Sequence, residues 1–287
     1  MNGGAKLDSA RVIQNMSPST DTRENREFAA ETKFLVAPPL ARQIRDWARA
    51  RLAPDPYVSG EANDTYDAYQ ITSLYFDTEQ FDVFHRRGSF GRSKYRIRRY
   101  GASEVAFLER KLKTRGLLTK RRSAVELEAL ERLVDPEAEG GWAGHWFHQR
   151  LLARRLRSIC EITYRRTARV SMTAYGPIRL TLDENIRALP APGLVFNGVK
   201  NGKRLSENQV VLELKYRFRM PVLFKLLVEE FALNPQPVSK YRLAAVALGY
   251  VPEPIPDPPV KDPMAIAVSF NRGSTQINAD GEKNIHG

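Results

Sequence analysis

Basic side chains recur at every second position in several segments of this chain. Lys94, Arg96 and Arg98 alternate with other residues in the run KYRIRRYG. Because successive side chains on a β-strand point to opposite faces, these three cations would lie on one face of a strand. Two guanidinium groups at this spacing suit successive phosphate groups of a chain, since each presents a planar fork of donors. The alternative is a solvated basic face on an exposed strand.

A second segment, FLERKLK at residues 107–113, places Glu109, Lys111 and Lys113 on one face. We expect the two lysines to bind phosphate. For Glu109 the alternative is a plain salt bridge to an arginine on the neighbouring strand. That alternative leaves the excess of lysines over carboxylates in this segment unexplained.

The segment VLELK places a single carboxylate, Glu213, on the same face as Lys215. A carboxylate among cations stays ionised and can act as a hard oxygen ligand, and Mg²⁺ is usually held by one or two carboxylates together with substrate phosphates. We therefore predict that Glu213 binds a divalent metal. The alternative is an ion pair with a neighbouring lysine or arginine.

The segment Ser239, Lys240 and Tyr241 directly precedes an apolar run with helical spacing. Ser239 is a suitable N-cap, and the backbone N–H groups of the first helical turn could then bind an anion. The alternative is a capped helix followed by an exposed lysine.

The composition indicates an anionic partner. Lys and Arg number 45 and Asp and Glu number 33, which gives a net charge of +12.

The single cysteine, Cys160, fits a reducing compartment, and no apolar run approaches the roughly 18 residues needed to span a bilayer. The N-terminus has no apolar core of a secretory signal, so a soluble cytoplasmic protein is expected. Glycine-rich phosphate loops and the Rossmann fingerprint are missing from the sequence.

Period-two patterning predicts a mainly β (α+β) fold with eight antiparallel strands that close into a barrel or tunnel. The strands are expected at 28–36, 69–77, 93–100, 104–113, 119–125, 160–170, 177–186 and 209–217. Helices are expected outside the barrel and at its C-terminal end, at 38–52, 78–86, 126–134, 142–156, 219–233 and 240–249. One domain would span 26–250, between a disordered N-terminal tail (1–25) and a proline-rich polar tail (251–287).

Eight short motifs follow one another along the chain: ETKF (31–34), SLYFDT (73–78), YRIRRYG (95–101), ERK (109–111), YRRTA (164–168), RLTLD (179–183), LELK (212–215) and SKY (239–241). In this order they resemble the VTC domain, the polyphosphate polymerase module of vacuolar transporter chaperone complexes in the triphosphate tunnel metalloenzyme superfamily. The resemblance covers about 26–250.

The resemblance implies an eight-stranded tunnel that binds ATP or polyphosphate through lysines and arginines, with Mn²⁺ or Mg²⁺ held by Glu213. It assigns phosphate contacts to Lys33, Arg96, Arg98, Lys111, Lys120, Arg166 and Lys240. Among these, Arg96, Arg98 and Arg166 would act on the transferring phosphoryl group. The strand faces add Lys94, Lys113, Arg179 and Lys215 as phosphate-binding candidates. Strand alternation puts Arg166 with the apolar Ile162 and Tyr164, which requires either a bulge or a different register.

The expected activity is transfer of the γ-phosphate of ATP onto inorganic polyphosphate. Hydrolysis of tripolyphosphate or nucleoside triphosphates, or non-catalytic binding of polyphosphate or RNA, are the alternatives. Ala29 stands where the wider superfamily often has a further glutamate, which favours the VTC branch over tripolyphosphatases and adenylate cyclases. Tyr95, Phe107 and Tyr216 form no evident base-stacking platform, so no specific nucleic acid is expected. A membrane partner and the oligomeric state stay open.

Overall fold

A computed structural model describes residues 21–27, 29–55, 67–114, 117–198, 202–205 and 208–251. For residues 21–27, 29, 113, 114, 117 and 118 the description is limited to the backbone. Most of the two predicted tails, and the side chain of Lys113, therefore lie outside the described part.

The core of the structure is one antiparallel sheet, and all eight predicted strands are present in it. They are β2 (Ala29–Val36), β4 (Ala68–Asp77), β5 (Ser93–Tyr100), β6 (Val105–Thr114), β7 (Leu117–Glu126), β8 (Arg157–Thr173), β9 (Gly176–Pro190) and β11 (Val210–Arg217). Together with β1 (Asp21–Glu27) they follow the order β1-β7-β6-β5-β4-β8-β9-β11-β2. Two short strands, β3 (Ala53–Pro54) and β10 (Lys203–Arg204), pair with β8 and β9.

Strand β1 corrects the sequence analysis, which predicts disorder through residue 25. Residues 21–27 instead pair antiparallel with β7 along their whole length. The polar composition of this segment gave no strand signal. Its pairing depends on backbone groups, which the edge of β7 supplies whatever the side chains are.

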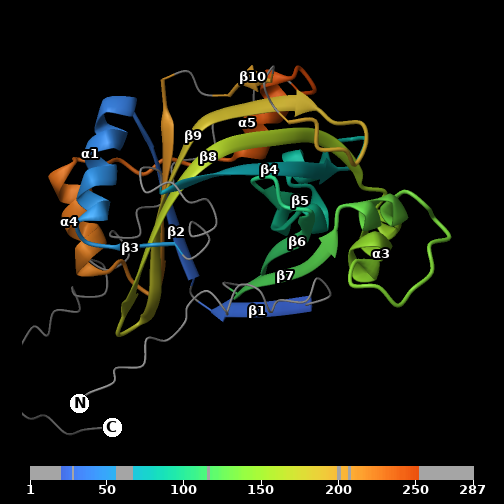
Figure 1. Ribbon diagram of the computed structural model, residues 1–287, viewed down its shortest axis with the longest axis horizontal. Helices are drawn as coiled ribbons and strands as arrows, with labels where there is room; N and C mark the ends of the chain where they lie inside the picture. Colours follow the sequence, from blue (N-terminus) through green and yellow to red (C-terminus); the bar gives the residue numbers. More distant parts are fainter. Residues whose placement is uncertain are drawn as a thin grey trace, which may run out of the picture. The chain divides into compact units, whose positions relative to one another are not determined.

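The sheet is strongly curled (Figure 1). Strands β2, β9 and β11 form one wall, β5, β6 and β7 form the opposite wall, and β4 and β8 connect the two. Lys111 Nζ on β6 lies 3.0 Å from Glu31 Oε2 on β2, although these strands are far apart in the hydrogen-bonded order. Side chains from opposite walls therefore meet, as expected for a tunnel fold. We call this concave side the inner face.

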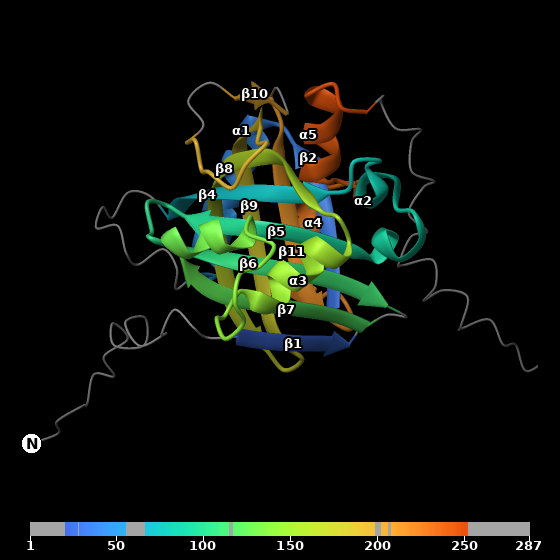
Figure 2. The same ribbon diagram turned by 90° about the vertical axis from the view of Figure 1, so that its right-hand side faces the viewer.

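Helices cover the outer face in two places. Helices α1 (Pro38–Arg49) and α4 (Val222–Glu230) pack on the wall of β2, β9 and β11, and the shared core includes Phe34, Ile44, Leu180, Leu212 and Phe224. Helix α3 (His145–Ala153) lies outside β5, β6 and β7 (Figure 2) and contributes Phe147 to the second core. Shorter helices occupy Asp82–His85 (α2), Gly88–Arg92 (η3) and Glu128–Leu133 (η4).

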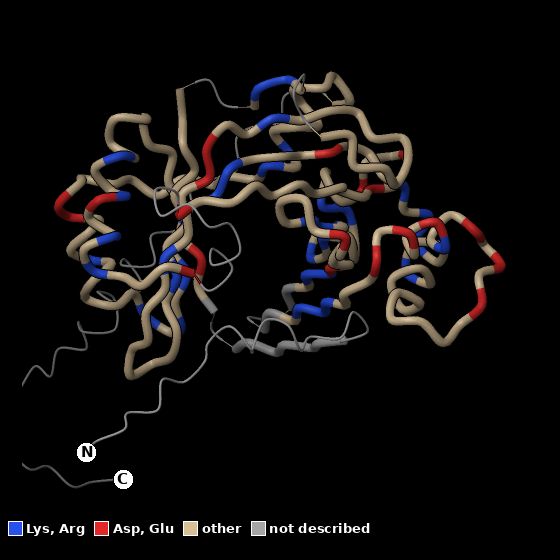
Figure 3. The backbone as a smooth tube through the Cα atoms, in the orientation of Figure 1, with Lys and Arg blue, Asp and Glu red and all other residues tan. Residues whose placement is uncertain are grey.

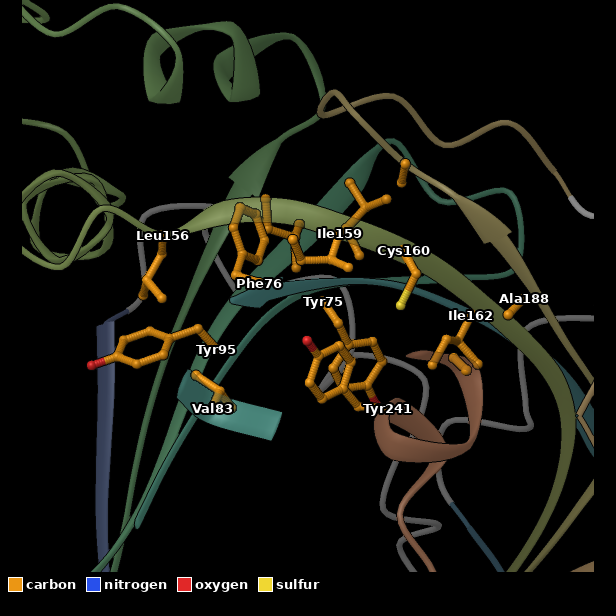
Figure 4. Close-up of a cluster of buried hydrophobic side chains, with 14 of the residues drawn as sticks. Tyr75, Phe76, Val83, Tyr95, Leu156, Ile159, Cys160, Ile162, Ala188 and Tyr241 are labelled. Carbon is orange, nitrogen blue, oxygen red and sulfur yellow. The ribbon is translucent and has the colours of Figure 1, made fainter. Parts of the chain in front are cut away.

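Helix α5 (Lys240–Ala247) packs instead against apolar residues of the inner face. The ring of Tyr241 stacks on Tyr75 with centroids 5.7 Å apart, next to Cys160 and Ile162 (Figure 4). The Tyr241 hydroxyl donates a hydrogen bond of 2.6 Å to the buried carboxylate of Asp77. This contact fixes the start of α5 inside the curl of the sheet. Among the described helices, none combines the length and apolar character needed to cross a membrane.

Candidate functional site

Many Lys and Arg positions lie along β5, β6 and β7 (blue in Figure 3). Cross-strand pairing aligns Lys94 with Lys111 and Lys111 with Lys120. The next row of the inner face contains Arg96, Glu109 and Arg122. The predicted alternation of β5 and β6 is therefore present, and it produces a lysine row beside an arginine–glutamate row.

Glu109 is the buried centre of the second row. Its carboxylate lies 2.6 Å from Arg96 Nε, 3.4 Å from Lys120 Nζ and 3.4 Å from Arg122 Nε. Burial alone would raise the pKa of Glu109, but these cations and Arg98 hold it well below its usual range. Glu109 is thus a permanent counter-ion, as in the salt-bridge alternative. Arg122 was missed by the sequence analysis, although it alternates with Lys120 and this spacing could have revealed it.

Arg98 occupies a different environment from Arg96. Its Nε donates to Ser73 Oγ at 3.2 Å and its Nη2 donates to the Tyr164 hydroxyl at 3.1 Å. Only 5% of the residue is exposed, yet no described carboxylate forms an ion pair with it. Arg98 is therefore held in place by neutral groups and keeps its charge available for an anion.

A second ion cluster joins β2 and β11. Lys215 Nζ lies 2.8 Å from one oxygen of Glu213, and Lys33 Nζ lies 3.6 Å from the other. Lys33 also contacts Glu31 at 2.9 Å. Burial would raise the pKa of Glu213, but Lys215 and Lys33 hold it well below its usual range. The same two lysines and Lys111 lower the pKa of Glu31 to about 2, against the effects of burial and of Glu213.

Glu31 and Glu213 are the pair that could hold a divalent metal. Both are ionised, both contact Lys33, and Lys215 lies within 3.9 Å of Glu31. Within the described ranges, no group of three or more His, Cys, Asp or Glu side chains is arranged as a metal site. Two carboxylates suffice when substrate phosphates and water complete the shell, as Mg²⁺ prefers. The donor set therefore fits a hard cation that arrives with a phosphate substrate.

Arg166 and Lys240 meet at Asp183. Arg166 forms a two-pronged ion pair with this carboxylate at 2.6 and 2.7 Å, and Lys240 Nζ approaches it to 2.7 Å. Burial opposes ionisation, but the two cations lower the pKa of Asp183 to about 2. The alternative of an exposed Lys240 is wrong, because only 10% of its side chain is exposed. Ser239 occupies the N-cap position of α5, but its side chain makes no capping hydrogen bond.

The register question at Arg166 is resolved by α5. Arg166 shares the inner face with Ile162 and Tyr164, which are apolar because α5 packs against this part of the sheet. A register shift against β9 also falls between Thr163 and Arg165. On β8, therefore, the rule that polar residues point to the inner face fails, because α5 covers the part of that face where Ile162 and Tyr164 lie.

The remaining candidates lie nearer solvent. The side chains of Lys111, Lys215 and Lys120 are 45%, 39% and 35% exposed, so solvent reaches the inner face. Arg179 contacts Asp55 at 2.5 Å and donates to the Tyr69 hydroxyl at 3.0 Å. Lys94 contacts solvent, but the surrounding protein and the charges of Lys33 and Lys111 lower its pKa to about 8.

Comparisons with known proteins identify a family. The family model described as VTC domain matches residues 28–248. A putative adenylate cyclase from Bacillus halodurans has a similar structure at 15% identity and a TM-score of 0.45, covering 76% of this chain and 95% of its own. A putative adenylyl cyclase from Hippeastrum, described as having a dominant triphosphatase activity, is 14% identical and has a TM-score of 0.42. The match covers 78% of this chain and 97% of that protein. No curated protein matches the chain significantly.

Proposed function

The chain belongs to the VTC domain family, and we propose that it is a metal-dependent polyphosphate polymerase that transfers the γ-phosphate of ATP onto inorganic polyphosphate. One observation carries the proposal. The inner face gathers cations from both walls around Arg98, a buried arginine without an ion-paired carboxylate among the described residues. A buried charge of this kind is costly unless an anion arrives to compensate it, and a phosphate chain would do so.

The arginines and the lysines would bind different parts of the substrate. Arg96, Arg98 and Arg166 would surround the transferring phosphoryl group, because their planar forks can bind phosphate oxygens in pairs. The lysines, as mobile point charges, would hold the rest of the chain: Lys33, Lys94, Lys111, Lys120, Lys215 and Lys240. Arg179, which contacts Asp55 as Arg166 contacts Asp183, would also belong to this set, and Lys113 stays a proposed contact from the sequence alone.

Mn²⁺ or Mg²⁺ would be held by Glu213, with Glu31 as the second carboxylate. A bound divalent ion would neutralise negative charge on the phosphate oxygens as the transfer proceeds. The lysines that contact both carboxylates keep them ionised, and hence able to bind metal, at all physiological pH values.

The reaction needs no protein nucleophile. An oxygen of the terminal phosphate of polyphosphate would attack the γ-phosphorus of ATP, a new P–O–P bond would form, and the bond to ADP would break with ADP leaving. Such a transition state depends on positioning and charge stabilisation, which fixed guanidinium groups supply. Arg98 is suited to this because Ser73 and Tyr164 already orient it before substrate binds.

Hydrolysis is the second candidate, since solvent reaches the exposed inner-face lysines Lys111 and Lys215. Water would then replace the polyphosphate oxygen as the attacking group, and free phosphate would be the product.

The test is to incubate the purified protein with ATP and Mn²⁺, separate the products on a polyphosphate gel and measure free phosphate in parallel. A ladder of long chains is the expected result. Free phosphate without a ladder would replace the polymerase with a hydrolase. Tight polyphosphate binding with neither product would indicate a binder.

A further inference from the structure

Three aromatic rings lie together on the inner face, one strand repeat beyond Arg98. Tyr100 follows Arg98 on the same side of β5, and Phe107 on β6 is the cross-strand partner of Arg98. The ring centroids of Tyr100 and Phe107 are 5.6 Å apart, and those of Tyr100 and Tyr69 are 5.9 Å apart. Residues from three neighbouring strands, β4, β5 and β6, thus build one cluster. We call Tyr69, Tyr100 and Phe107 the aromatic cluster.

Two arginines lie next to the aromatic cluster. The guanidinium of Arg122 lies 3.5 Å from the ring centroid of Phe107 and 5.5 Å from that of Tyr100. Arg98 lies 6.0 Å from the Tyr100 centroid. All three rings are only partly buried, whereas Tyr95 and Tyr164 are 2% and 1% exposed. Partly open rings beside arginines are the combination that binds bases next to their phosphates.

The order of residues along β5 and β6 gives this end of the inner face a direction. Tyr100, Arg98, Arg96 and Lys94 succeed one another on β5, and Phe107, Glu109 and Lys111 do so on β6. Tyr100 and Arg96 are separated by about 13 Å at the usual rise of a strand. A molecule with an aromatic head and a phosphate tail matches this series, because the rings lie at one end of it and the row of lysines at the other.

We propose that the aromatic cluster is a nucleobase platform, on which the base of a nucleoside triphosphate stacks while its phosphates run past Arg98 towards Arg96. This inference rests on the proposed function, in which ATP is the phosphate donor. The γ-phosphate then points towards the row of Lys94, Lys111 and Lys120, so the acceptor chain enters from the lysine row. Because stacking tolerates any base, GTP binds nearly as well as ATP.

The test separates base recognition from phosphate recognition. Dissociation constants for ATP and for inorganic tripolyphosphate are measured by calorimetry in EDTA, where metal-dependent turnover does not occur. The variants are Tyr100→Leu and Phe107→Leu, which keep an apolar side chain but remove the ring. Tyr175→Leu is the matched control, because Tyr175 lies at the tip between β8 and β9 and is 49% exposed.

The affinity for ATP falls about tenfold in Tyr100→Leu and in Phe107→Leu, while the affinity for tripolyphosphate changes less than twofold. Tyr175→Leu leaves both affinities unchanged. An equal loss for both ligands would assign the cluster to structure or to phosphate binding, and an unchanged ATP affinity would remove the platform. Either result overturns the proposal.

Failure of the polymerase proposal gives a different pattern. If the protein makes no polyphosphate but the two variants lose ATP affinity selectively, the platform stands and the reaction assignment falls. If the wild-type protein binds neither ligand in EDTA nor with Mn²⁺ present, both proposals are wrong.

Discussion

Arg98 on β5 donates a hydrogen bond of 3.1 Å to the hydroxyl of Tyr164 on β8. The ring of Tyr164 also lies 4.8 Å from Lys240 Nζ and 5.3 Å from the guanidinium of Arg166. One buried, neutral ring therefore contacts three cations and neutralises none of them. Arg166 and Lys240 already pair with Asp183, whereas a carboxylate in place of Tyr164 would also pair with Arg98 and compete there with phosphate. Tyr164 is, in this account, the residue that positions the phosphoryl-transfer centre.

Replacing Tyr164 with Phe removes the acceptor for Arg98 and keeps the ring. We expect polyphosphate synthesis to slow roughly tenfold, because a small displacement of a catalytic group is costly. The KM for ATP should change much less than kcat, since the remaining cations still bind the triphosphate. Steady-state kinetics at varied ATP concentration measure this split. A rise in the KM for ATP with an unchanged kcat would instead assign Tyr164 to substrate binding.

Arg98→Ala should reduce synthesis by about 10²- to 10³-fold, the usual effect of losing one fixed donor to developing charge. The fold should stay intact, because Arg96, Lys120 and Arg122 still contact the Glu109 carboxylate that Arg98 helps to keep ionised. The matched control is Arg99→Ala on the opposite face of β5, where Arg99 donates to the Ser103 and Ala102 carbonyls. Thermal unfolding and the gel assay are run together. Equal activity in the two variants would remove Arg98 from the mechanism.

Glu213→Gln should abolish stimulation by Mn²⁺ and leave the fold intact, because Glu31 still lies 2.9 Å from Lys33 and 3.9 Å from Lys215. Asp183→Asn provides the contrast. Asp183 is completely buried between Arg166 and Lys240, so its loss should lower the free energy of unfolding by about 3–5 kcal/mol. Denaturant unfolding and a Mn²⁺ titration of activity distinguish the two. Retained Mn²⁺ stimulation in Glu213→Gln would rule out the ligand role.

The affinity for long-chain polyphosphate should fall as the pH rises through about 8. Burial and the charges of Lys33 and Lys111 lower the pKa of Lys94 to about 8, so this lysine loses its positive charge there. Burial opposes ionisation of Tyr100, but Arg98 and Arg122 lower its pKa to about 8, so a negative charge appears in the same range. Both changes weaken anion binding.

In the double variant Lys94→Arg with Tyr100→Phe, the charge at these two positions stays constant in this range. Its affinity for polyphosphate should stay nearly level, and binding measured across the pH series checks this. An equally steep fall in the double variant would locate the titrating groups elsewhere.

Sequence patterns predicted eight strands of the sheet and the strand faces of several charged residues, whose functional roles stay proposals. Alternation in 94–100 and 107–113 predicted both the strands and the face on which Lys94, Arg96 and Glu109 lie. The pattern failed on β8, because α5 covers part of the inner face and makes Ile162 apolar there. It also failed for residues 21–25, whose strand is determined by the edge of β7 rather than by their own side chains.

Contacts across the curl of the sheet could not have been predicted from one sequence. The ion pair of Lys111 with Glu31 joins residues 80 positions apart, and it depends on how far the sheet bends. The same holds for the hydrogen bond from Arg98 to Tyr164 and for the meeting of Tyr69 with Tyr100. Alternation determines the face of a side chain, whereas curvature and register determine its neighbours.

The most direct measurement is a phosphate balance with γ-labelled ATP, Mn²⁺ and a polyphosphate primer. ADP, free phosphate and label in long-chain polyphosphate are determined in the same reaction, with Arg98→Ala in parallel. The account predicts one labelled phosphate in the polymer for each ADP released, little free phosphate, and loss of both products in the variant. ADP release matched by free phosphate, with no label in the polymer, would contradict it.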